Sequence, residues 1–175
     1  MLHDRAADTS VTRTFISDGE AIMSAQQQAL TPAQQKLLRP KRLMATGQFD
    51  AKINLSPVIF QTLTLKHDFE RATYSIDARH ADNSVTIKEI HIRLPDNVRT
   101  GSVIDLSKQE FTEVKVWYAV KSPTEHYTVT CIAGTLTILS LSAGIIKISG
   151  QLRGTTDTNP SGNAFVLDVD FDLSS

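Results

Sequence analysis

Strict alternation of apolar and polar residues near the end of the chain constrains the fold more than any other feature of the sequence. The segment 165–173 carries a large apolar residue at every second position, with aspartates at three of the positions between. Only an extended strand, whose successive side chains point to opposite faces, places all these apolar residues on one side. The apolar positions are Phe165, Leu167, Val169, Phe171 and Leu173. We therefore predict a strand with one face in a core and an acidic outer face.

The same period of two recurs over most of the chain from residue 44 onward. The alternating runs cover residues 49–55, 59–65, 72–78, 85–94 and 114–120. Pairs such as Ser56-Pro57 and Asp82-Asn83 supply turn chemistry between the runs. Short strands without intervening helices favour antiparallel pairing over parallel βαβ units. We predict a mainly β fold, an antiparallel β-sandwich or β-barrel of about 8–10 strands, because either arrangement buries many one-sided strands.

Residues 1–43 differ from the remainder in pattern and predict a polar N-terminal arm. Helix-forming residues fill the segment 20–30, and Thr31 and Pro32 suit the N-cap and first position of a second helix. Pro40 ends that helix. We expect one or two short helices in an arm of residues 1–43, followed by an antiparallel β domain of residues 44–175.

Composition and charge exclude several classes of protein. A chain of 175 residues is long enough to bury about two-thirds of its unfolded surface in one core. Its formal net charge of −1 provides no global field for nucleic acid. The single cysteine, Cys131, permits neither an intramolecular disulfide nor a thiolate metal site. Because no apolar leader or spanning segment is visible, we expect a soluble protein that is cytoplasmic, or exported without a recognisable N-terminal signal peptide.

The acidic face of the last strand is the first candidate site. Asp168, Asp170 and Asp172 stand two residues apart and share one face, so together they provide the oxygen ligands that calcium prefers. The alternative is a solvated outer face whose charge blocks edge-to-edge association. Both interpretations stay open from sequence alone.

Trp117, with Lys115 beside it, is the second candidate site, for binding a partner or a sugar. It is the only tryptophan, and on an extended strand its side chain points to the opposite face from those of Val116 and Tyr118. Lys115 and Ala119 flank it on the same face, which leaves room above the ring. Exposed large aromatics of this kind anchor partners. Cover from the N-terminal arm, or a strand buried on both faces, would explain the same pattern.

Motifs for catalysis, cofactors and nucleic acid are missing from the sequence. The five histidines lack the spacing of a zinc pair, and neither a Gly-x-Ser-x-Gly elbow nor a Gly-rich phosphate loop occurs. The basic cluster in 36–42 contains no aromatic residue and fits a helix C-terminus. We therefore expect no cofactor, no nucleic-acid partner and no membrane span.

Two segments resemble the closing strands of small bacterial β-sandwich or lipocalin-like proteins. They are Gly134-Thr135-Leu136-Thr137-Ile138 and Ile148-Ser149-Gly150-Gln151-Leu152. The resemblance covers some twenty residues and implies the fold class only.

Three functions from different classes fit these observations. The favoured hypothesis is a non-enzymatic binding or interaction module, with a protein partner or a second copy of the chain. A lipocalin-like barrel that carries a small apolar ligand is an alternative. A hydrolase whose site converges only in three dimensions is another.

Overall fold

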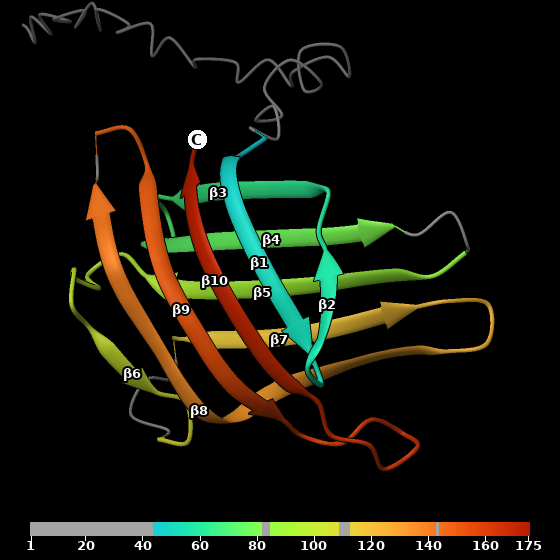
Figure 1. The fold of residues 1–175 in the computed structure, drawn as a ribbon. Coiled ribbons are helices and arrows are strands. Elements are labelled where there is room, and N and C mark those ends of the chain that lie inside the picture. Colours follow the sequence, from blue (N-terminus) through green and yellow to red (C-terminus); the bar gives the residue numbers. More distant parts are fainter. Residues whose placement is uncertain (1–43, 82–84, 109–112, 143) are drawn as a thin grey trace, which may run out of the picture. The chain divides into compact units, whose positions relative to one another are not determined.

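The computed structural model describes residues 44–81, 85–108, 113–142 and 144–175, and this part of the chain forms ten β-strands (Figure 1). Their bounds are β1 Thr46–Ile53, β2 Ser56–Ile59, β3 Thr62–Asp68, β4 Thr73–Ala81, β5 Ile87–Pro95, β6 Val103–Asp105, β7 Lys115–Lys121, β8 His126–Ser142, β9 Lys147–Thr156 and β10 Val166–Ser174. The described residues contain no helix, and therefore no helix that is long and apolar enough to cross a membrane. The prediction of a mainly antiparallel β structure is confirmed. The expected helical arm of residues 1–43 lies outside the described residues, and the division of the chain at residue 44 stays a prediction.

The strands form one continuous antiparallel sheet that curls into a half-barrel. Its order is β2-β1-β10-β9-β8-β7-β5-β4-β3, with β6 pairing separately with β8. The 17-residue strand β8 belongs to both halves, because its first part pairs with β7 and its later part with β9. Register shifts at Cys131/Ala133 and Ile138/Ser140 interrupt the pairing with β9. Such bulges bend a strand, so β8 turns the sheet from one half into the other (Figure 1).

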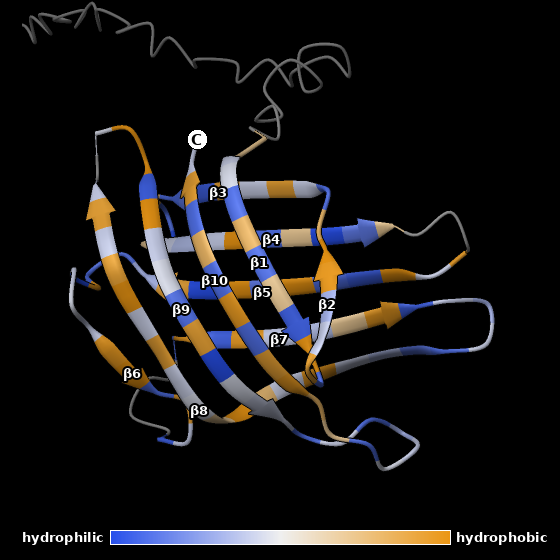
Figure 2. Cartoon of the chain, viewed as in Figure 1, coloured by the Kyte–Doolittle hydropathy of each residue, from blue (hydrophilic) through white to orange (hydrophobic). Residues whose placement is uncertain are grey.

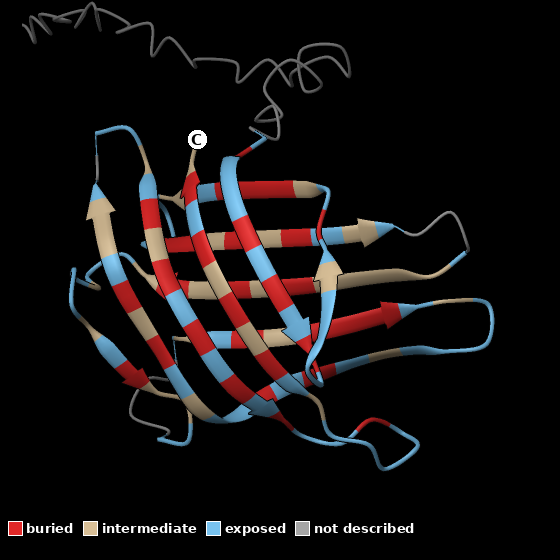
Figure 3. Cartoon of the chain, viewed as in Figure 1, coloured by how far each residue is buried: buried red, intermediate tan, exposed pale blue. Residues whose placement is uncertain are grey.

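The inward-facing side chains of both halves of the sheet form one core. Figure 3 shows buried residues recurring at every second position along the strands, and Figure 2 shows that these positions are mostly hydrophobic. Leu136, Leu152 and Val169 lie directly opposite one another on β8, β9 and β10, and all three are fully buried. Residues from β3, β4, β5 and β7 complete the same cluster. The outward-facing side chains are therefore supported by a packed core.

Cys131 points into this core, and we expect its thiol to be unreactive in the folded protein. Burial, assisted by the negative charge of Asp157, raises the pKa of Cys131 to about 12. Thiol reagents attack the thiolate, which is scarce at pH 8 when the pKa is so high. Ellman's reagent should label the native protein only on the timescale of unfolding, and label it at once in guanidinium. Rapid stoichiometric labelling of the native protein would contradict this placement.

Candidate functional site

Outward-facing side chains of four neighbouring strands meet in one row across β3, β4, β5 and β7. Thr64 lies directly opposite Asp77, Asp77 opposite His91, and His91 opposite Trp117. Side chains that are opposite one another on adjacent strands are close enough to interact. We call these four residues the Trp117 row.

Polar contacts and ring stacking connect the Trp117 row. The Thr64 hydroxyl donates to Asp77 Oδ2 over 3.0 Å, and His91 Nδ1 lies 2.7 Å from Asp77 Oδ1. The hydrogen bond with His91 holds the pKa of Asp77 below its ordinary value, although burial opposes this shift. The His91 ring stacks on the indole of Trp117, with centroids 5.4 Å apart and planes at 23°. The row thus fixes the orientation of Trp117 from the side of β5.

Replacing Asp77 with asparagine is expected to destabilise the protein at neutral pH and much less in acid. The pKa of Asp77 in the folded protein is below its ordinary value of 3.8. The charged carboxylate therefore contributes stability that is present above 3.8 and lost as the pH falls through the lower folded value. Urea unfolding of both proteins at pH 7 and at pH 3 measures the difference. A difference that stays constant across this range would contradict the role given to the charge.

The structure places Trp117 and Lys115 on the outer face of β7, as the alternation of residues along this strand predicts. Trp117 is half-buried and Lys115 is exposed. Arg93 lies opposite Lys115 on β5, and its guanidinium carbon is 5.9 Å from the centre of the Trp117 ring. That distance is within the range of a cation–π interaction. The two residues predicted to contact a partner are therefore accompanied by His91 and Arg93.

Two adjoining depressions hollow this face. One has a volume of about 260 Å³ and the other of about 280 Å³, and Lys66, Asp77 and His91 line both. Glu89 in the first depression is already neutralised, because Lys121 Nζ is 2.6 Å and Arg79 Nε 3.6 Å from its carboxylate oxygens. The second depression contains Arg93 and Trp117. It is the part of the face that combines an aromatic ring with cations.

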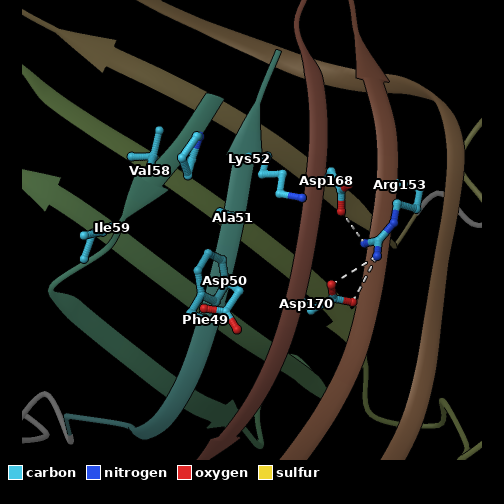
Figure 4. A pocket seen from close by; sticks show the side chains of 10 residues that line it. Phe49, Asp50, Ala51, Lys52, Val58, Ile59, Arg153, Asp168 and Asp170 are labelled. Carbon is cyan, nitrogen blue, oxygen red and sulfur yellow. Dashed lines mark hydrogen bonds and ion pairs between the residues drawn. The ribbon is translucent and has the colours of Figure 1, made fainter. Parts of the chain in front are cut away.

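The acidic triplet lies on the outer face of the other half of the sheet, where basic residues meet it. Arg153 Nη1 is 2.8 Å from Asp168, and Arg153 Nη2 is 3.1 Å from Asp170. Lys147 Nζ is 3.8 Å from Asp172. Figure 4 shows the Arg153 guanidinium between Asp168 and Asp170. The triplet thus lies on an outer face, but β10 pairs with β1 on one side and β9 on the other, so its charges do not protect a sheet edge as the alternative supposed.

A depression of about 460 Å³ lies beside these residues, where β2 runs along β1 (Figure 4). Its charged residues are Asp50, Lys52, Arg153, Asp168 and Asp170, and residues of β2 form its apolar rim. Although this hollow is the larger one, its arginine is already bound to two carboxylates. Carboxylates outnumber cations in this hollow, whereas cations outnumber carboxylates in the hollow beside Trp117.

Calcium binding by the triplet stays a prediction, and Arg153 provides its test. In the part of the chain that the structure describes, no three His, Cys, Asp or Glu side chains are arranged to hold a metal. Arg153→Gln would free Asp168 and Asp170, so calcium binding by the triplet predicts an affinity at least tenfold tighter in the variant than in the wild type by calorimetric titration. The lost exposed ion pairs should cost about 1 kcal/mol or less. Equal affinity in both proteins would show that Arg153 does not occupy the carboxylates.

Sequence reasoning missed Asp77, His91 and Arg93. Each is one of many polar residues on an alternating run, and His91 has no other histidine at the spacing of a metal-binding pair. The alternation in the sequence indicates that their side chains face outward. It does not indicate the pairing register between strands that brings them beside Trp117. Cross-strand register was the missing information.

Comparison with protein-family models finds no match for this chain, and neither the curated proteins nor the solved structures yield one.

Proposed function

We propose that the protein is a non-enzymatic binding module whose recognition surface is the outer face of β3, β4, β5 and β7. The observation that carries the proposal is the Trp117 row, in which hydrogen bonds and stacking hold a half-exposed indole at the edge of the hollow of about 280 Å³. Rigid aromatic side chains with few rotamers make large contacts at a small entropic cost. A pre-oriented indole on a filled scaffold suits recognition of a partner.

The same geometry bears on the two alternatives. A carrier of an apolar ligand needs an interior cavity, whereas the inward side chains here pack into one core. The hydrolase has one observation in its favour, since a carboxylate orients His91 as in catalytic triads. However, no hydroxyl or thiol of the described residues forms a hydrogen bond with His91 Nε2. The binding module accounts for the indole and both hollows, so it is preferred.

The proposal is tested with the full chain. Labelled protein is incubated with arrayed peptides, glycans and nucleotides, and each captured ligand is titrated by calorimetry. Trp117→Leu should weaken binding more than tenfold, which corresponds to about 1.4 kcal/mol and is typical of a central aromatic anchor. His91→Gln, which leaves Trp117 present, should weaken it less.

Lys147→Gln on the outer face of the other half is the matched control and should bind as the wild type does. Circular dichroism verifies that each variant is folded. Ligands whose affinity is unchanged by Trp117→Leu, or lost with Lys147→Gln, would place recognition elsewhere and overturn the proposal.

A further inference from the structure

A row of cations crosses the proposed recognition surface one step from the Trp117 row. Lys66 lies directly opposite Ser75, Ser75 opposite Arg93, and Arg93 opposite Lys115. Adjacent strands are about 4.8 Å apart, and opposite Cβ atoms on one face about 5 Å. The Ser75 hydroxyl is therefore flanked on both sides by long basic side chains.

Within the described part of the chain, the three basic side chains of this row form no direct ion pair. Among the described residues, no carboxylate oxygen lies within 4.0 Å of Lys66, Arg93 or Lys115. Elsewhere on the same surface, Arg79, Lys121 and Arg71 each have an acidic partner. Like charges that face one another across strands repel. An anion placed between them would remove that repulsion.

Arg93 is the least satisfied member of the row. Its Nε is buried and has no hydrogen-bond partner among the described residues. Its guanidinium is placed over the Trp117 ring, which orients the group without using its N–H donors. Arginine binds oxyanions through paired N–H donors, so an acceptor is missing here.

The hollow of about 280 Å³ lies over these residues and carries a small excess of positive charge. Its cations are Lys66, Arg71 and Arg93, against Asp68 and Asp77. Asp68 pairs with Arg71, with 3.8 Å between Oδ2 and Nε. Thr64 and His91 both bind the Asp77 carboxylate. Asp77 also attracts Lys66, whose charge helps to lower the pKa of this carboxylate. Arg93 is therefore the cation of the hollow that has no acidic partner among the described residues, and it can attract a ligand to the Ser75 part of the hollow.

We propose that Lys66, Ser75 and Arg93 form a binding site for an oxyanion, a phosphoryl or carboxylate group of the ligand that the module recognises. The inference rests on the proposed function and specifies its ligand chemistry. Three donors from three adjacent strands converge on the anion, and the neighbouring indole contacts the group that bears it. Lys115 adds long-range attraction from the end of the row.

The site is tested by titrating the full chain with sodium phosphate, and separately with sodium acetate, against sodium chloride at equal ionic strength. Trp117 is the single tryptophan, so its emission reports on Arg93 above it. We expect a saturable change with a dissociation constant of about 1 mM, which is typical of a small anion on a few charged donors. A response to phosphate alone identifies a phosphoryl site, and an equal response to acetate identifies a carboxylate site. Identical curves for all three salts would overturn the proposal.

Substitutions test whether the response to anions comes from the site formed by Lys66, Ser75 and Arg93. Arg93→Gln should weaken anion binding at least tenfold and Ser75→Ala about threefold, measured by calorimetry because Arg93→Gln itself alters the surroundings of Trp117. Arg79→Gln, the same substitution on the same surface at an arginine that pairs with Glu89, should bind as the wild type does. Equal weakening by Arg79→Gln and Arg93→Gln would show a diffuse charge effect and overturn the site. If no anion binds but array ligands still depend on Trp117, the proposed function survives without this site.

Discussion

Substitution of Gly134 with alanine is expected to remove a large part of the stability of the fold. Gly134 follows the bend of β8 with φ +110°, where a side chain is strained, and an added Cβ would lie 2.0 Å from the carbonyl oxygen of Arg153. The clash is with backbone of the paired strand β9, which cannot move without breaking its pairing. Strain at such a φ costs about 1–3 kcal/mol, and the clash adds to it. Against a typical total stability of about 5–15 kcal/mol, we expect a loss of about 3 kcal/mol or more by urea unfolding.

A matched substitution separates the two causes of this loss. Gly101 also has a positive φ, +83°, but an added Cβ there would meet no atom within 4 Å. Gly101→Ala should therefore cost only the conformational strain, about 1–2 kcal/mol. If Gly101→Ala and Gly134→Ala destabilise equally, close approach of β8 and β9 at Gly134 is not what requires glycine.

Alternation in the sequence predicted which face each side chain takes, because this property depends only on neighbouring residues in one strand. Trp117 is on the opposite face from the buried Val116 and Tyr118, as its parity indicated. The same reasoning placed the three aspartates on one outer face. Strand existence and facing are local properties, and so they could be predicted.

Turn positions and register depend on tertiary pairing and could not be predicted in the same way. A two-residue turn at Asp82-Asn83 would pair Asp77 with Lys88, whereas the observed register pairs it with His91. Ser56-Pro57 was expected to be a turn, but both residues begin β2.

The reversal before β2 occurs at Asn54 and Leu55, which have positive φ values of 50° and 66°. Proline is tolerated in β2 because this strand is at the edge of the sheet. A shift of a few residues in such a turn changes which side chains meet across two strands. The partners of Trp117 therefore needed the structure, although Trp117 itself did not.

Truncation of Leu152 to alanine is expected to destabilise the protein by about 4 kcal/mol, near the upper end of the range for buried leucines. Leu152 is fully buried between Leu136 and Val169 on the adjacent strands. The inward neighbours of Leu152 along β9 are glycines, so no side chain of its own strand can fill the space. The Phe171 ring is already packed against Gly150, 2.6 Å from where a Cβ would lie. Because the surroundings cannot collapse, most of the cavity should persist.

The same chemical change at Leu139 supplies the control. Leu139 is on β8 and 52% exposed, so Leu139→Ala creates no cavity and should change stability by no more than about 0.5 kcal/mol. Urea unfolding of both variants, with equal slopes against denaturant, gives the comparison directly. A loss below about 2 kcal/mol for Leu152→Ala would mean that the half-barrel closes over the missing side chain. The interior would then be adaptable, and the carrier hypothesis would gain the cavity that the packed core argues against.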